Sequence, residues 1–462
     1  MDFLITYEHK AREIESVLLL KILLERKGYS VMLYPWYAET REMQEIVKKD
    51  PPKVFVISAT YNEDNFRTFV TRVVGFANKI INLRWEQVFT VEDENIPIDI
   101  NLPAFYPSGI VREVVHVCWG VEEQRQLIAR GVKKEKAALI GHIGMDYLRP
   151  EFRNLMPSKE EISELYHLDL SKKWALFISS FTVYEYDKRT EQEHRTLTGN
   201  LGVEEVFIKA CIESRKLLLE WFEHVLEEVN DTIIIYRPHP NEAKTPKELS
   251  ALEAKYDNFR VISDLSVKQW INVSDIIYNW FSSSFADIAF LGKKSFLLRP
   301  YYISPEYDYK ALSIQPQIST YDDFYKSLNK SFYSDSEKNL EFNSIIHEYY
   351  DNDMYGEPAY IKAVNLFEKV YNTSELDIHY PIRFIIESKV LFLNRKILSY
   401  INWFLVKAPI LKKTILKDWY KKRIENEKFA KERLAKGFVR NVATQQEIDE
   451  MTEKLKKILF NG

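Results

Sequence analysis

The sequence is poor in cysteine, glycine and proline, and it contains no long hydrophobic run. Its two cysteines, Cys118 and Cys211, are too few for a disulfide framework or a four-ligand zinc site, and their scarcity is typical of a reducing compartment. With 13 glycines and 17 prolines in 462 residues, it cannot be a collagen-like or low-complexity chain. No window reaches 18 uninterrupted apolar residues, and the N-terminus shows no secretion signal. We therefore expect a cytoplasmic chain that is at most peripheral to a membrane.

Apolar side chains are abundant and charge is unevenly distributed. Hydrophobic residues make up 46% of the chain, which is ample for roughly two to three domains. The net charge is only −4, but residues 381–440 contain 16 Lys and Arg against 5 Asp and Glu. The rest of the chain therefore carries −15, and the basic segment alone favours a polyanionic partner.

The first 146 residues alternate short apolar runs with helical patterns, which is typical of a parallel sheet covered on both faces. We expect strands at 3–6, 30–34, 53–59, 80–84, 114–119 and 137–140, with helices that include 11–27, 66–79 and 122–130. This pattern predicts a Rossmann-like domain over residues 1–146.

A polar linker is predicted at 147–173, followed by a second Rossmann-like domain with return helices at 174–380. The expected strands are 175–179, 232–236, 259–262, 276–278 and 295–298, and the expected helices are 204–229, 267–273, 285–291, 321–328, 340–350 and 360–371. The fold class is therefore α/β, with two Rossmann-like domains facing across a cleft and a helical basic tail at 381–462. Ligands of such sheets bind outside the carboxyl ends of the strands.

The segment Arg237-Pro238-His239-Pro240 directly follows the predicted strand 232–236. Two prolines hold the backbone stiff at the strand end and direct Arg237 and His239 outward. The alternative is a proline-rich turn with a surface histidine.

Three hydroxyls, Ser282, Ser283 and Ser284, open the helix predicted at 285–291. Helix N-termini favour anions, although a serine can also simply cap a helix. We expect these serines and His239 to lie on neighbouring strand ends, where with Arg237 they would form a phosphate site.

These motifs together resemble the donor-nucleotide site of GT-B transferases that build bacterial surface polymers: capsule Kdo transferases, polysialyltransferases and teichoic-acid glycerophosphotransferases. The segments Ile5–Glu13, Cys118–Gly120 and Gly141–Asp146 also resemble surface-carbohydrate biosynthesis proteins related to that group. The likeness covers about residues 1 to 300.

The resemblance implies that His239 and Ser282 to Ser284 bind the phosphates of a CMP- or CDP-linked donor. It implies a metal-independent glycosyltransferase that moves a sugar, such as that of CMP-Kdo or a CMP-sialic-acid-like donor, to a lipid-linked or growing surface polysaccharide. The alternatives are a CDP-glycerol or CDP-ribitol phosphotransferase of the teichoic-acid type, a UDP-sugar epimerase, and a non-catalytic scaffold.

The sequence contains no clear counterpart of the acidic motif that supplies the general base in the polysialyltransferases. We therefore expect the base at the strand ends of the first domain. Glu86 is the first candidate, because Trp85 could desolvate it and stack on a sugar, and Glu8 is the second. His9, Lys10 and Arg12 would suit an anionic acceptor or a donor carboxylate. Each of these groups could instead be a solvated surface charge.

No cofactor or metal site is predicted. The nine histidines are scattered without the paired spacing of zinc ligands, and no Gly-x-Gly-x-x-Gly follows a strand.

The basic tail mixes aromatic and aliphatic residues with Lys and Arg at helical spacing, which is typical of an interfacial helix on an anionic membrane. We therefore expect residues 381–440 to hold the protein on the inner face of the plasma membrane. The alternative is a basic helix packed on protein. Nucleic acid is not expected as a partner, because no binding module is recognisable.

Overall fold

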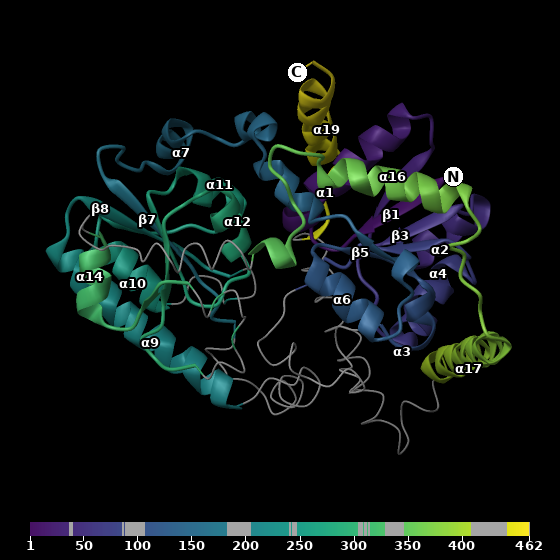
Figure 1. Ribbon diagram of the computed structural model, residues 1–462. Coiled ribbons are helices and arrows are strands. Elements are labelled where there is room, and N and C mark those ends of the chain that lie inside the picture. The colour runs from purple at the N-terminus through teal and green to yellow at the C-terminus, as the bar shows by residue number, and fades with distance from the viewer. Residues whose placement is uncertain are drawn as a thin grey trace. The chain divides into compact units, whose positions relative to one another are not determined.

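Two six-stranded parallel sheets form the cores of two units in the computed structural model (Figure 1). The structure describes residues 1–36, 40–85, 87, 107–182, 205–239, 242, 247–303, 308, 312, 315–328, 346–407 and 441–461. The predicted α/β class, with two Rossmann-like domains each built on a parallel sheet, is confirmed. The cleft between them stays a prediction.

The first unit is built on a sheet of strand order β2-β1-β3-β4-β5-β6. Its strands are β1 (Phe3–Tyr7), β2 (Val31–Pro35), β3 (Val54–Ile57), β4 (Ile80–Asn82), β5 (Val115–Cys118) and β6 (Ala137–Leu139). Its helical segments are α1 (Lys10–Arg26), α2 (Thr40–Lys49), α3 (Glu63–Asn65), η1 (Phe66–Val70), α4 (Thr71–Val74), η2 (Gly109–Glu113), α6 (Val121–Ala129), η3 (Lys134–Lys136), η4 (Ile143–Leu148), α16 (Ala359–Asn372), α17 (Ile382–Lys407) and α19 (Gln445–Asn461).

Successive side chains of a strand point to opposite faces of the sheet, which explains why helices cover both faces. Leu4 packs with residues of α2, η1 and α4 on one face, whereas the neighbouring Phe3 stacks on Phe367 of α16, with ring centroids 6.1 Å apart. Helix was expected at 66–79. Instead, a π-helical turn and α4 end at Gly75, which has φ +65°, because the chain turns there and Phe76 packs on Tyr380.

The second unit is built on a sheet of strand order β12-β11-β10-β7-β8-β9. Its strands are β7 (Lys173–Ile178), β8 (Thr232–Arg237), β9 (Phe259–Val261), β10 (Ile276–Asn279), β11 (Ser295–Leu298) and β12 (Gln317–Ile318). Its helices are η5 (Pro150–Leu155), α7 (Lys159–Tyr166), α9 (Glu205–Glu228), α10 (Lys247–Lys255), α11 (Val267–Val273), α12 (Phe285–Phe290) and α14 (Tyr321–Leu328). Most of the helix expected at 340–350 lies outside the described residues.

Part of the predicted linker 147–173 is structured within this second unit. A capping box of Ser158 and Glu161 starts α7, and Ile162 and Leu168 are buried with Trp174 and Trp270 against one face of the sheet. The other face is covered by α9, α10 and α14.

The segment after Tyr350 returns to the first unit, although the sequence placed residues up to 380 with the second domain. Asn352 exchanges hydrogen bonds with the backbone of His142, at 2.8 and 3.1 Å, and the Asp146 carboxylate accepts the N–H of Tyr360 in the first turn of α16 at 2.8 Å. Gly141 has φ +92° and faces Asn352 Oδ1 and Asp351 O so closely that a Cβ would lie 3.1 Å from each. The Gly141–Asp146 motif therefore holds α16 in place.

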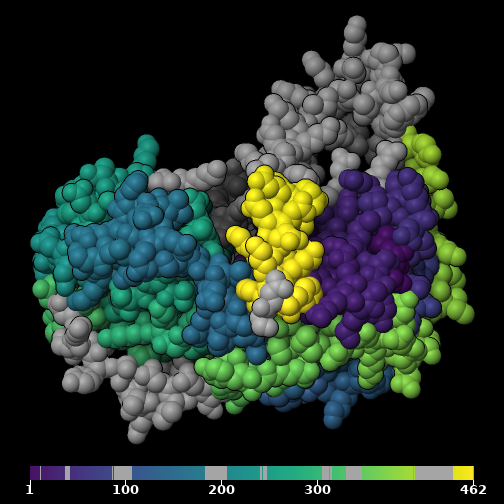
Figure 2. All heavy atoms as spheres, turned by 90° about the horizontal axis from the view of Figure 1, so that it is seen from above, coloured from purple at the N-terminus to yellow at the C-terminus, as the bar shows by residue number. Residues whose placement is uncertain are grey.

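The C-terminal helix α19 also packs on the first unit, along α1. Leu455 is fully buried, Arg26 lies over the ring of Phe460 at 4.2 Å, and the Tyr7 hydroxyl accepts the N–H of Ala443 at 3.2 Å. Figure 2 shows α19, in yellow, against the purple N-terminal segment. The end of the chain is therefore part of the first unit's fold, so truncation after residue 380 would uncover its core.

Candidate functional site

The carboxyl edge of the second sheet contains a topological switch point. The chain runs from β7 outward through β8 and β9, then returns to β10 on the other side of β7 and runs outward through β11 and β12. Loops after the two central strands diverge at such a point and leave a crevice where open α/β sheets bind ligands. In this sheet the crevice lies where β7 and β10 end.

The two predicted motifs flank the end of β7. In the strand registers Ile178 of β7 pairs with Arg237 of β8 on one side and with Asn279 of β10 on the other. The expectation that His239 and the serines follow neighbouring strands is wrong, because β7 lies between β8 and β10. Two strands separated by a third are about 10 Å apart, so a phosphate held by both motifs would lie over the end of β7.

The His239 loop is braced by a buried carboxylate, Glu242. One oxygen of Glu242 accepts the hydroxyl of Tyr236 at 2.7 Å, and the other accepts the hydroxyl of Ser179 at 2.6 Å and the N–H of His239 at 3.1 Å. Glu242 N–H donates in turn to His239 O at 2.8 Å. Burial raises the pKa of Glu242, and these hydrogen bonds oppose the rise. The loop that presents His239 is therefore held by bonds to its backbone.

Arg237 ends β8 and is engaged by its own chain. Its guanidinium donates to the carbonyl oxygens of Asp264 and Leu265, at 2.7 and 2.5 Å. Burial lowers the pKa of Arg237 to about 10, so it stays charged at neutral pH. In this structure Arg237 ties β8 to the 264–265 turn, and its contact with a phosphate stays a prediction.

The serines form a turn between β10 and α12. Ser282 Oγ accepts the N–H of Ser284 at 3.2 Å, and Ser284 is the N-cap residue of α12 but makes no side-chain cap bond. Ser283 is exposed, while Ser282 and Ser284 are half-buried. The hydroxyls of Ser283 and Ser284 have no hydrogen-bond partner among the described residues. The helix-capping explanation therefore leaves these two hydroxyls unused.

A buried arginine supports the serine turn from β11. Arg299 donates to both oxygens of Asp308, at 2.8 and 3.0 Å, and its guanidinium lies 5.7 Å from the ring of Trp280 and 5.9 Å from that of Phe281. Burial lowers the pKa of Arg299, and Asp308 opposes this. Trp280 and Phe281, which precede the serines, thus pack on the charged Arg299 guanidinium.

One more acid follows the serines in the chain. Asp287, in the first turn of α12, is buried, and burial raises its pKa to about 6. Glu242 and Asp287 each lie within three residues of one of the two motifs, but no role was predicted for either. Their burial, which no local pattern reveals, distinguishes them from surface acids.

The first sheet has its own switch point between β1 and β3, and Glu8 follows β1 there. Glu8 is half-buried, and its N–H donates to the buried carboxylate of Glu13 at 2.8 Å. The three neighbouring basic residues each contact another residue of the chain. His9 Nδ1 lies 2.9 Å from Asn441 Oδ1, Lys10 donates to Glu447 at 2.7 Å, and Arg12 donates to Glu13 at 2.9 Å. An anionic ligand would therefore compete with these contacts.

Glu86 lies outside the described residues, but the two residues before it are described. Arg84 has φ +50° and is buried with Glu123, and its guanidinium Nη2 lies 2.5 Å from Glu123 Oε1. Trp85 is 3% exposed and packs edge-on against His142, with ring centroids 5.7 Å apart. The indole is therefore part of the core rather than an open platform for a sugar, which differs from the role expected for it.

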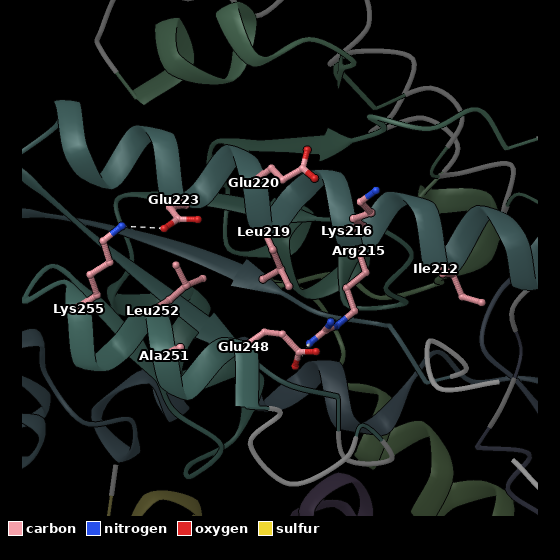
Figure 3. Close-up of a pocket in the computed structure, with 10 residues that line it drawn as sticks. All are labelled: Ile212, Arg215, Lys216, Leu219, Glu220, Glu223, Glu248, Ala251, Leu252 and Lys255. Carbon is pink, nitrogen blue, oxygen red and sulfur yellow. Dashed lines mark hydrogen bonds and ion pairs between the residues drawn. The ribbon is translucent and has the colours of Figure 1, made fainter. Parts of the chain in front are cut away.

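A cavity of about 530 Å³ lies between α9 and α10 of the second unit (Figure 3). Its wall carries three basic and three acidic residues, and Lys255 pairs with Glu223 at 2.8 Å. Arg215 connects this wall to the braced loop, with its Nε 3.8 Å from Glu242 Oε1. Because the charges balance and the cavity lies on helices rather than at strand ends, it is a poor match for a phosphate group.

Among the residues with described positions, no group of three or more His, Cys, Asp or Glu side chains could hold a metal ion. Cys118 and Cys211 are both buried, and burial raises the pKa of Cys118 well above its usual value.

The comparisons with known proteins gave matches only among solved structures. No family model and no curated protein matches the chain. S. aureus MnaA with UDP is similar at 14% identity and a TM-score of 0.49, covering 82% of this chain and 99% of that one. A UDP-GlcNAc 2-epimerase from Neisseria meningitidis, bound to UDP-GlcNAc, is similar at 10% identity and a TM-score of 0.46, covering 80% and 99%. The wall teichoic acid polymerase TagF is similar at 13% identity and a TM-score of 0.47, covering 80% and 88%. At these identities and TM-scores the likeness says nothing about substrate or activity.

Proposed function

We propose that the chain is a metal-independent transferase that moves a sugar from a CMP-activated donor to a hydroxyl of a lipid-linked or growing surface glycan. The proposal is carried by one observation: a histidine loop braced through its backbone, and a serine turn with two hydroxyls that have no partner among the described residues, flank the switch point of the second sheet. Hydroxyls, backbone N–H groups and an imidazole are the donors that a leaving phosphate needs.

The donor site can be tested by calorimetry on the full chain with CMP, CDP and UDP. We expect CMP or CDP to bind more tightly than UDP. The triple change Ser282→Ala, Ser283→Ala and Ser284→Ala should weaken binding by about tenfold or more, because each lost hydrogen bond to a charged phosphate is worth roughly 1.5–3 kcal/mol. Ser319→Ala, an exposed serine of the same unit, is the control. Absence of binding by all three nucleotides would overturn the proposal, and tighter binding of UDP would favour a UDP-sugar enzyme.

The acceptor base is proposed to be Glu8 or Glu86. The strand order favours Glu8, because it follows β1 at the switch point of the first sheet, whereas Glu86 follows β4, two strands away. Replacing the correct glutamate with glutamine keeps the shape and removes the basicity, so CMP release from the donor should slow while nucleotide affinity holds. If neither variant slows turnover, the base lies elsewhere.

A further inference from the structure

Helix α17 presents an apolar stripe that nothing in the described part of the chain covers. Large hydrophobic side chains recur along it at intervals of four, four, three, four and three residues, which places them on one helix face. They are Ile382, Ile386, Val390, Leu393, Ile397 and Tyr400, with exposed fractions between 47% and 77%. Isolated exposed apolar residues are ordinary, but a continuous stripe along a helix indicates a binding surface.

The opposite face of α17 is anchored to the first unit near its start. Phe384 is buried and packs on Phe66 and Phe76, and Ser388 is fully buried. The Nη2 atom of Arg67 pairs with the Glu387 carboxylate at 3.0 Å. In Figure 1 α17 lies at the periphery of the first unit, beyond α3. The stripe is therefore held at a fixed orientation on the outside of the domain.

Basic residues flank the stripe. Lys389 and Lys396 each stand one position before a stripe residue and lie along one side of it, and Arg383 lies along the other. All three are exposed. Residues 381–407 contain five Lys and Arg and one acidic residue, Glu387, so two copies of this helix would repel each other. Among the described residues, no helix is long and apolar enough to cross a membrane.

We propose that α17 lies flat in the interface of an anionic lipid bilayer. Its stripe faces the acyl chains, and Lys389, Lys396 and Arg383 lie at the level of the anionic headgroups. An excess of positive charge beside apolar side chains disfavours self-association, and it is the combination that anionic lipid recognises. This inference rests on α17 alone and does not depend on the chemistry of the donor site.

The test is co-sedimentation of the full chain with vesicles of phosphatidylcholine alone and of phosphatidylcholine mixed with phosphatidylglycerol. Binding should be stronger on the anionic vesicles and should weaken between about 0.1 M and about 1 M salt, because the screening length falls from roughly 10 Å to 3 Å. The charge variant Lys389→Gln with Lys396→Gln should lose about fivefold in affinity per residue on anionic vesicles. The stripe variant Ile386→Gln, Leu393→Gln and Ile397→Gln should lose about tenfold or more on both kinds of vesicle.

A matched control uses three equally exposed apolar residues of the second unit, Leu165, Leu170 and Val206, all replaced by glutamine. This control should bind vesicles like the wild type. Equal pelleting of the stripe variant and the wild type would overturn the proposal. So would a wild-type dimer that ignores vesicles and becomes monomeric in the stripe variant, which would identify the occupant as a second copy. Calorimetry with CMP on the same variants keeps the two proposals separate, since loss of vesicle binding should leave nucleotide binding unchanged.

Discussion

Replacing His239 with alanine is expected to slow sugar transfer by about 10²-fold, equivalent to roughly 2.7 kcal/mol of transition-state stabilisation. The imidazole is proposed to stabilise charge that develops on the leaving phosphate, and its loss would leave that charge to the serine turn alone. The measurement is the rate of CMP release from a CMP-activated sugar.

The His239→Ala variant should lose the imidazole without disturbing the loop that holds it. Glu242 holds the loop through the N–H and the carbonyl of residue 239, and both bonds survive the change to alanine. The thermal midpoint should therefore stay close to that of the wild type. His379→Ala, an exposed histidine of the first unit, serves as the control. Wild-type rates in the His239 variant would remove the main support for the phosphate site.

Replacing Glu123 with leucine is expected to destabilise the protein by about 3–5 kcal/mol, because it leaves the Arg84 guanidinium in the core without its carboxylate. Both side chains are only 1% exposed. Burial raises the pKa of Glu123 and the charge of Arg84 opposes that rise, so the pair depends on both partners. The measurement is urea-induced unfolding of the full chain, followed by tryptophan fluorescence.

The double change Arg84→Met and Glu123→Leu should recover most of this loss, since two apolar side chains can replace a buried ion pair. Arg125→Gln breaks the pair between the exposed Arg125 and the half-buried Glu122 of the same helix, and should change stability by only about 0–1 kcal/mol. A loss below about 1 kcal/mol in the Glu123 variant would show that the pair is not desolvated as the structure indicates.

Much of the fold could be read from local sequence. Strands such as β1, β7 and β8 are short apolar runs bounded by turn residues, and α1 ends near Gly28, as its spacing predicts. These features follow from contacts between residues near each other in the chain. Residues Arg237 to His239 and Ser282 to Ser284 were likewise placed correctly at strand ends, because a strand and the loop that follows it are contiguous in sequence.

The predicted site was less complete, because which strands lie side by side is a non-local property. Spacing along the chain suggested that the His239 loop and the serine turn follow neighbouring strands, yet β7 lies between them. No local pattern distinguishes Glu242 and Asp287 from surface acids, and only their burial in the folded protein does so. The sequence also could not show that Lys10 would pair with Glu447, 437 residues away.

The sequence by itself determined the two α/β domains, the strand-end motifs and the basic amphipathic character of α17, because each depends on composition and periodicity over one or two elements. Only the tertiary structure decided that residues 351–407 and 441–461 belong to the first unit and which face of α17 is left exposed. It also decided where each sheet has its switch point. These outcomes depend on which apolar surfaces remain uncovered once the sheets have formed, and that can be judged only when segments hundreds of residues apart are brought into contact.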